Sequence, residues 1–249
     1  MINSVLESVF FKNVSNLDEQ FVASKFTERF FVKNQVVFNQ GDLGLEMYIV
    51  KSGSLQIFLQ ENDKIIVVGH QFPGESIGEL EVMHYNHHRL ASVSAYEDSI
   101  LWMIKKNDLE DLIQQYPIVM QKIFFNVSER LAQADRKIAY LAFMDSRLRM
   151  ANLLLELYDN FGFQSENGLQ INWKVTQQHL ANMIGVNRES AARALQGLQD
   201  EGLIQIHNKT ITLLDLLRLR QLANDANPLG TREWHSTYKY QINIDKSPL

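Results

Sequence analysis

The stretch that decides the fold is residues 174–202, which read KVTQQHLANMIGVNRESAARALQGLQDEG. Thr176 is a good N-cap for a short helix, because its hydroxyl can accept a hydrogen bond from a free backbone N–H of the first turn. Gly185 then supplies a tight turn, and Asn187 can cap a second helix. The stretch therefore predicts a helix-turn-helix.

The second helix of this stretch has two different faces. At about 100° per residue, its small and aliphatic side chains fall on one stripe and its charged side chains on the other. The apolar stripe holds Ala191, Ala194, Leu195 and Leu198, and the other face holds Arg188, Glu189, Ala192, Arg193 and Gln196. Arg can bond guanine through two acceptors, and Glu can accept from the cytosine amino group. This face suits base reading in the major groove, with an ordinary solvated helix face as the alternative.

The residues that follow, 202–213, read GLIQIHNKTITL. Two short β-rich runs separated by Asn208 and Lys209 are typical of a hairpin with a tight turn. A hairpin directly after a helix-turn-helix is the wing of a winged helix. The whole pattern, more than any single residue, favours DNA binding.

Length and composition limit the remaining classes. The chain has 249 residues, 45% of them hydrophobic, and no cysteine. Disulfides, thiolate zinc sites, iron–sulfur clusters and cysteine nucleophiles are therefore excluded. No apolar run approaches the ~20 residues that span a bilayer, and residues 1–11 lack the pattern of a signal peptide. We expect a protein of the cytoplasm without a membrane partner.

The net charge of −5 is unevenly distributed. Residues 1–145 carry 13 basic against 19 acidic side chains, whereas residues 146–223 carry 8 against 7. The acidity therefore lies in the N-terminal part. Because the C-terminal part is only marginally basic, specific contacts or dimer avidity must supply much of the affinity for DNA.

The N-terminal part changes from helical to β-rich patterns. Residues 5–25 predict short helices, and several short strands follow between residues 29 and 103. The predicted strands are 29–32, 36–38, 47–50, 54–58, 64–68, 91–93 and 100–102, and Gly41, Gly53, Gly69, Gly74 and Gly78 are expected at the turns. Many short strands with regular turns predict a jelly-roll or barrel-like domain.

Residues 117–144 have no internal Gly or Pro and predict one long helix. Apolar residues recur along it with the 3.5-residue period of a coiled-coil seam. The seam consists of Met120, Phe124, Val127, Leu131, Ala134, Ile138 and Leu141. A parallel homodimer contact is favoured over a helix buried in its own domain. The expected division is 1–116 for the β-roll, 117–145 for the dimerisation helix, 146–223 for the winged helix and 224–249 for a C-terminal tail.

Several motifs in this order resemble the CRP/FNR family, the bacterial regulators that include the catabolite activator protein and the fumarate–nitrate regulator. The motifs are Val37-Phe38-x-x-Gly41, Tyr48-Ile49-Val50-x-x-Gly53-x-Leu55, Phe72-Pro73-Gly74-Glu75-x-Ile77-Gly78-Glu79-Leu80, Arg130-Leu131-Ala132 and Arg188-Glu189-Ser190-x-x-Arg193. The resemblance covers roughly residues 20–215. It implies an α+β fold, with an N-terminal β-roll, a long dimerisation helix and a C-terminal winged helix-turn-helix.

The resemblance also implies the partners and the reading residues. A dimer of this family would bind double-stranded DNA at an inverted repeat, and RNA polymerase is a further candidate partner. Arg188, Glu189 and Arg193 would read bases, with Ser190 in the same motif, and Thr176 and Gln177 would help at phosphates or base edges.

Gly78-Glu79-Leu80 and His88-Arg89-Leu90-Ala91-Ser92 resemble the phosphate-binding cassette of cyclic-nucleotide domains. Arg89 would fork to a phosphate from a partly exposed loop, so that its removal would leave the fold intact, and Glu79 would accept from a ribose hydroxyl. Leu90 stands where a small residue is usual. On the long helix, Ala134 and Asp135 replace the hydroxyl pair that contacts adenine in the catabolite activator.

The effector therefore stays open between a cAMP-like cyclic nucleotide, which is favoured, another small anion and no ligand. Arg130 and Asp135 have the spacing that helps to bind 2-oxoglutarate in related nitrogen-control regulators, but Glu79 would repel a dicarboxylate. Haem at His84, His87 or His88 is disfavoured. Without a Gly-x-Ser-x-Gly, P-loop or His-Glu-x-x-His motif an enzyme is not expected, and a module acting through protein contacts is the remaining alternative. Nothing assigns a role to Trp234, Tyr238 and Tyr240.

Overall fold

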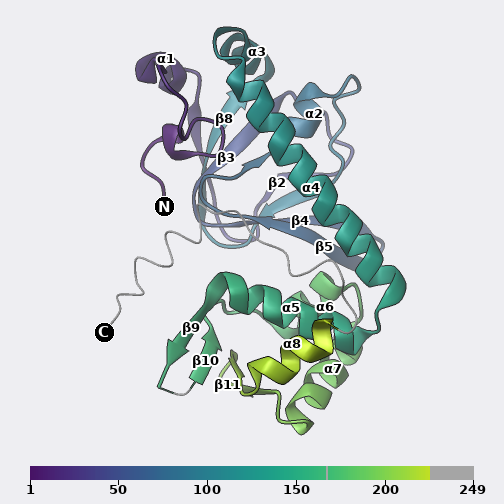
Figure 1. Cartoon of the computed structure of the whole chain (residues 1–249). Coiled ribbons are helices and arrows are strands. Elements are labelled where there is room, and N and C mark those ends of the chain that lie inside the picture. The colour runs from purple at the N-terminus through teal and green to yellow at the C-terminus, as the bar shows by residue number, and fades with distance from the viewer. Residues whose placement is uncertain (167, 225–249) are drawn as a thin grey trace. The chain divides into compact units, whose positions relative to one another are not determined.

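The computed structural model describes residues 1–166 and 168–224 (Figure 1). Trp234, Tyr238 and Tyr240 lie outside the described residues, so their role stays open. Contacts divide the chain into two compact units, one made of residues 1–63 and 68–132 and the other of residues 64–67 and those from 133 onward. No described helix is long and apolar enough to cross a membrane.

The first unit is built on two four-stranded antiparallel sheets. Short helical segments precede them, η1 (Val5–Glu7) and α1 (Glu19–Ser24), as the sequence predicts. The strands are β1 (Thr27–Phe31), β2 (Val36–Phe38), β3 (Glu46–Ser52), β4 (Leu55–Glu61), β5 (Lys64–Gln71), β6 (Ser76–Ile77), β7 (Ser92–Ala95) and β8 (Ser99–Lys105). Their order is β1-β8-β3-β6 in one sheet and β2-β7-β4-β5 in the other. All seven predicted strands are present, and the two-residue β6 is an addition.

The central strands of the first sheet, β3 and β8, are buried on both faces. Tyr48 and Leu101 pack into one cluster with residues of the second sheet, whereas Met47 and Trp102 pack into another with the N-terminal segments. Because alternate side chains of a strand point to opposite faces, a strand covered on both sides must be apolar throughout. The near-continuous apolar run of β3 therefore marks it as the centre of the unit.

The predicted turn glycines are confirmed with one exception. Gly41, Gly53, Gly74 and Gly78 all have a positive φ, which favours glycine. Gly69 was wrongly expected at a turn, because it lies inside β5. A Cβ at this position would meet only the Ile57 side chain, at 3.9 Å, so a glycine here reflects neither strain nor a turn.

Three helices complete the first unit, and the last of them continues into the second. They are α2 (Glu79–Met83), α3 (Lys106–Gln115) and α4 (Ile118–Phe143). The prediction of one long helix is confirmed, since α4 begins directly after Pro117. Val119 and Ile123 near its start are buried in the core cluster that contains Met47 and Trp102.

The second unit combines helices with a small antiparallel sheet. Its elements are α5 (Ser146–Phe161), β9 (Gly162–Ser165), β10 (Gly168–Ile171), α6 (Gln177–Ile184), α7 (Arg188–Asp200), β11 (Ile204–His207), β12 (Thr210–Leu213) and α8 (Leu216–Asn224). The strand order is β11-β12-β10-β9. The wing predicted from residues 202–213 is confirmed, whereas the hairpin β9–β10 was not expected. Helix α5 is capped by Asp145, whose side chain accepts from the Leu148 N–H at 2.8 Å.

Candidate nucleic-acid interface and ligand pocket

Local capping fixes the two helices of the helix-turn-helix. The Thr176 hydroxyl accepts from the His179 N–H at 3.1 Å, and the Asn187 side chain accepts from the Ser190 N–H at 2.8 Å. Gly185 ends α6 with φ 70°, and a Cβ there would lie 3.0 Å from the Leu141 side chain. The turn therefore requires glycine for its backbone angle and favours it for space.

The two faces of α7 lie as the sequence predicts. Ala191, Ala194, Leu195 and Leu198 are buried against the rest of the unit. Arg188, Glu189 and Arg193 are exposed on the opposite side, with Ser190 half-buried between them. The Arg193 guanidinium donates to the Ser190 hydroxyl at 2.9 Å. The buried stripe fixes the rotation of the helix and so decides which side chains it presents to solvent.

Arg188 and Glu189 keep their charged groups available. Neither forms an ion pair within the part of the chain that the structure describes. An arginine that is not held by a carboxylate can direct both of its terminal nitrogens to guanine without first breaking a salt bridge. The start of α7 is therefore free for base recognition.

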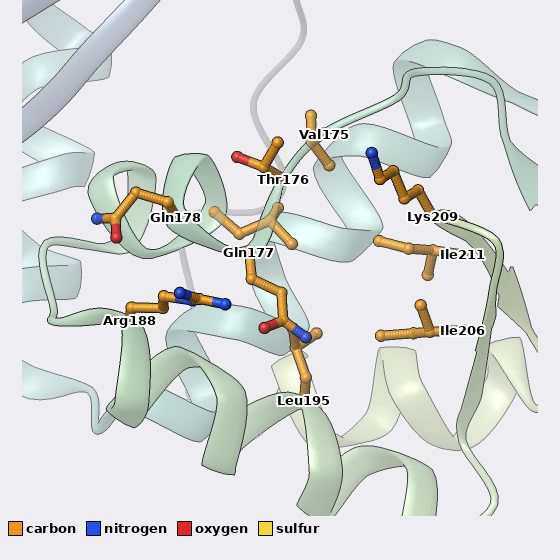
Figure 2. A pocket seen from close by; sticks show the side chains of 10 residues that line it. Val175, Thr176, Gln177, Gln178, Arg188, Leu195, Ile206, Lys209 and Ile211 are labelled. Carbon is orange, nitrogen blue, oxygen red and sulfur yellow. The ribbon is translucent and has the colours of Figure 1, made fainter.

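A groove of about 310 Å³ lies between α6, α7 and the wing. Figure 2 shows Gln177 of α6 and Arg188 of α7 extending toward the same space, with Ile206 and Ile211 of the wing facing it. Thr176 and Lys209 line the same groove. Three predicted reading residues, Thr176, Gln177 and Arg188, are thus brought together on one surface.

Lys209 lies at this groove, although the sequence predicts it only as part of a turn. Asn208 and Lys209 both adopt a positive φ, 48° and 65°, as a two-residue hairpin turn requires. The turn presents the exposed Lys209 side chain at the edge of the groove (Figure 2). The available signal was that Lys209 is the single Lys or Arg of the wing sequence 203–213.

Helix α6 carries a buried histidine beneath this surface. His179 is 8% exposed, and its ring meets the Trp173 ring edge-on, with centroids 6.0 Å apart. Burial lowers the pKa of His179 to about 4, because desolvation disfavours the charged imidazolium. His179 is therefore neutral at neutral pH and belongs to the support of α6 rather than to its charged surface.

In the first unit, the expectation of a partly exposed Arg89 is wrong. Its side chain is fully buried, and it is one of the largest side chains in the interior. A Cβ on Gly44 would collide with Arg89 Nε, and one on Gly78 would collide with Nη1. Two glycines therefore make room for the guanidinium, a close approach that the motif alone did not reveal.

Carbonyls, carboxylates and an aromatic ring surround the Arg89 guanidinium. Nη2 donates to the Glu46 carbonyl at 2.7 Å, and Nη1 donates to the Gly78 carbonyl at 3.4 Å. Carboxylate oxygens of Glu46 and Glu81 lie 3.4 Å and 3.6 Å from these nitrogens. The Phe38 ring centroid lies 4.0 Å from Cζ. These opposite charges explain how an arginine can be buried here.

Tyr48 helps to hold Glu46 in this arrangement. Its hydroxyl donates to Glu46 Oε1 at 3.3 Å. Burial, followed by the nearby Glu46 charge, raises the pKa of Tyr48 to about 12. The hydroxyl therefore remains protonated at neutral pH and can act as a donor.

Glu79 is fully buried at the start of α2 and faces α4. Arg130 Nη1 forms an ion pair with Glu79 Oε1, and this contact joins two predicted pocket residues that are 51 positions apart. Among the described residues, Glu79 Oε2 and Arg89 Nε have no hydrogen-bond partner. A buried acceptor and a buried donor that lack partners fit a polar ligand with hydroxyl and anionic groups.

The other predicted pocket residues are less enclosed. Leu80 is half-buried, and the Leu90 side chain is 59% exposed, although its backbone N–H donates to Glu81 Oε1 at 3.1 Å. Asp135 is exposed and falls in the second unit. Its role at the pocket stays a prediction. Glu46 and Glu81, which no sequence motif singled out, are in direct contact with Arg89.

The predicted seam residues of α4 divide by exposure. Phe124 is 72% exposed, and Leu131 and Ile138 are each 63% exposed. Ala134 is exposed as well, whereas Val127 and Leu141 are half-buried. Phe125 and Phe143 add 63% and 85% exposed side chains that the heptad pattern did not include.

Two family models match the chain over the regions that hold these sites. The model described as a cyclic nucleotide-binding domain matches residues 28–116, which include Arg89. The model described as a Crp-like helix-turn-helix domain matches residues 148–222, which include α6, α7 and the wing.

Individual relatives match most of the chain. The CRP-like protein Clp of Xanthomonas campestris pv. campestris is 31% identical over 202 residues, 78% of this chain and 86% of that protein. The Cyclic AMP receptor protein of Thermus thermophilus is 29% identical over 204 residues, 80% of this chain and 89% of that protein.

Solved structures agree with these matches. The c-di-GMP responsive global regulator CLP from Xanthomonas campestris superimposes with a TM-score of 0.71 at 29% identity, covering 78% of this chain and 96% of that chain. A CooA mutant from Carboxydothermus hydrogenoformans gives a TM-score of 0.74 at 20% identity, covering 90% and 97%, a likeness that concerns the fold alone.

The fold and the two matched domains define a helix-turn-helix transcription regulator that carries a cyclic nucleotide-binding domain. The chain belongs to the CRP/FNR family. The resemblance stated from the sequence and the predicted fold class are thereby confirmed. Since the relatives are transcription regulators and not enzymes, the prediction that the chain is not an enzyme is confirmed as well.

Proposed function

We propose that this DNA-binding regulator acts as a homodimer on an inverted repeat, with α7 of each copy reading one half-site. The observation that carries the proposal is the exposed face of α7, where Arg188 and Glu189 form no ion pair with any residue that the structure describes. Arg188, Glu189 and Arg193 read bases, Ser190 orients Arg193, and Thr176 and Gln177 contact the backbone or base edges. Lys209 adds a phosphate contact from the wing.

The homodimer forms along α4 in this proposal. Phe124, Leu131 and Ile138 are exposed apolar side chains seven residues apart, with Ala134 between the last two. A stripe with this period buries itself against an identical stripe in a two-helix contact. The half-buried Val127 and Leu141 flank the contact.

The β-roll serves as the sensor domain, and a cyclic nucleotide is the proposed effector. The support is Glu79 Oε2, a buried acceptor with no hydrogen-bond partner among the described residues, which can accept from a ribose hydroxyl, together with the buried Arg89 guanidinium, which can donate to a phosphate. Names of the relatives point to two ligands, cyclic AMP and cyclic di-GMP. Gly78, Leu80, Leu90 and Arg130 complete the proposed pocket within the first unit, and residues 117–145 connect it to the winged helix at 146–223. The role of Asp135 stays a prediction.

The DNA-reading part is tested by selecting binding sites from random duplex DNA with the full chain. We expect an inverted repeat whose half-sites lie about one helical turn apart, because the two reading helices of a symmetric dimer enter successive major grooves on one side of the duplex. Recovery of sequences without two-fold symmetry would contradict the dimeric arrangement, and recovery of no preferred sequence would contradict base reading by α7.

A further inference from the structure

Glu81 holds an unusual place in the first unit. It lies in α2, two residues after Glu79, and its side chain is 9% exposed. Glu81 Oε1 accepts from the Leu90 N–H at 3.1 Å, and Glu81 Oε2 lies 3.6 Å from Arg89 Nη1. The Glu81 carboxylate therefore bridges the Arg89 guanidinium and the backbone N–H of Leu90.

These two donors are the kind that an oxyanion needs. A phosphate is recognised by a guanidinium together with a converging backbone N–H, because both direct positive charge to its oxygens. The Glu81 carboxylate supplies two negatively charged oxygens to the same donors. A second anion would have to displace the Glu81 carboxylate from the Leu90 N–H, and it would also meet the like charge of Glu81 beside Arg89.

The surrounding contacts keep Glu81 at the guanidinium. Gly44 and Gly78 enclose Arg89 so closely that a Cβ on either would collide with it, so the guanidinium has little room to move away. Glu46 Oε1, 3.4 Å from Nη2, contributes a second negative charge from a less buried position. The buried charge of Arg89 is thus neutralised by the chain itself.

We infer that Glu81 is an internal competitor for the anionic group of the effector, an inference that rests on the proposed effector site. A cyclic nucleotide enters the cradle formed by Arg89 and the Leu90 N–H only when the Glu81 carboxylate leaves it. Glu81 therefore sets the affinity of the β-roll for anions and keeps it low. The Leu90 side chain is not the obstacle, because it is 59% exposed.

The test is calorimetry of the full chain with cyclic AMP, cyclic GMP, cyclic di-GMP and inorganic phosphate as probes. Glu81→Gln keeps an amide oxygen for the Leu90 N–H but removes the charge. We expect it to bind a cyclic nucleotide about tenfold or more tightly than the wild type, because the ligand then displaces a neutral amide rather than a charged carboxylate. Glu61→Gln is the matched control, since Glu61 is an exposed glutamate at the end of β4.

Each outcome decides one question. The inference is supported if Glu81→Gln binds the cyclic nucleotide more tightly than the wild type while the affinity of Glu61→Gln is unchanged. If the double variant Glu81→Gln/Arg89→Lys loses this gain in affinity, the ligand binds in the cradle formed by Arg89 and the Leu90 N–H. Equal, measurable affinity in wild type and Glu81→Gln overturns the inference while the proposed effector site stands. If no probe binds either protein, the inference and the effector assignment both fail. DNA affinity, measured on the same samples, tests the proposed DNA recognition by α7 separately. Circular dichroism checks that each variant is folded.

Discussion

At the scale of single residues, Arg188 carries the sharpest prediction about DNA. It is exposed at the first turn of α7, lines the groove beside Gln177 and has no ion pair to give up among the described residues. We expect Arg188→Ala to weaken specific binding by about 1–3 kcal/mol and to relax the preference at one guanine of each half-site. The measurement is a gel shift on the selected site and on single-base variants of it.

The matched control is Arg218→Ala, which removes the same charge from an exposed position of α8. This change should leave the base preference intact. If both variants lose affinity equally on every sequence, Arg188 contacts phosphates and the assignment of base reading is wrong.

His179 predicts a pH dependence of stability. Its pKa is lowered to about 4 in the folded chain from the ordinary value of 6.5, because burial disfavours the charged ring. The unfolded chain then binds more protons between these values, so the stabilising contribution is complete above about pH 6.5 and is lost as the pH falls toward 4. The loss amounts to at most about 3 kcal/mol.

Urea unfolding of the full chain at several pH values between about 4.5 and 7.5 measures this loss, since that window runs from near the folded pKa of about 4 to above the unfolded pKa of 6.5. We expect His179→Gln to be less stable at neutral pH and to show a smaller change on acidification than the wild type. His207→Gln, which changes an exposed histidine of the wing, should keep the wild-type pH dependence. An identical slope in His179→Gln would assign the effect to other groups.

For Arg89, the sequence predicts the place in the pocket but not the burial of the side chain. Its type and motif identified it as a pocket residue, and the structure places it beside Gly78 as expected. Its burial could not be predicted, because burial depends on Gly44, Glu46 and Glu81, which are far from it in sequence or carry no motif of their own. A local pattern identifies a charged side chain but not the distant charges that allow it to be buried.

At the scale of elements, the hydrophobic periodicity of the sequence predicted helices and strands correctly where the pattern extended over many residues. The strands of the roll, helix α4 and the two helices of the helix-turn-helix all appear within a few residues of their predicted places. The hairpin β9–β10 was missed because its four-residue strands are mostly half-buried and rich in Gly, Ser and Gln, so the sequence reads as a loop. Gly69 caused the opposite error: it lies inside β5, but glycine is typical of turns, so the sequence predicts a turn there.

Helix α4 carries the prediction about assembly. If the exposed stripe of Phe124, Leu131 and Ile138 is the dimer contact, Ile138→Asp places two like charges in an apolar interface and costs on the order of several kcal/mol. We expect monomers that no longer bind a full inverted repeat. Analytical ultracentrifugation measures the mass of each variant.

Ala132→Asp is the control, because Ala132 is exposed on α4 outside the heptad positions. It should sediment like the wild type. A dimer that survives Ile138→Asp but not Ala132→Asp would move the contact to another face of α4.

At the scale of the whole molecule, α4 is the element through which an effector signal would pass. It begins in the first unit, where Arg130 pairs with Glu79 of the proposed pocket, and it ends in the second unit. Two sites are coupled only if the ligand of one has different affinities for two states of the chain, and the coupling then acts equally in both directions. The ion pair between Arg130 and Glu79 is the contact that a ligand at Glu79 would disturb.

The last prediction uses Glu81→Gln as the background, because the internal competitor is removed there. A cyclic nucleotide that binds this variant should change its DNA affinity by about 5–150-fold, the usual range of allosteric coupling. Adding Arg130→Gln should reduce this ratio toward one, since the pocket then loses its charged contact with α4, whereas adding Arg136→Gln, which removes the same charge elsewhere on α4, should leave it in place. The measurement is DNA affinity with and without saturating cyclic nucleotide, together with calorimetry to show that each double variant still binds the ligand. Unchanged coupling in the Arg130 variant would mean that the signal reaches the reading helix by another route. A ligand that binds without any effect on DNA affinity would leave the β-roll without a regulatory role.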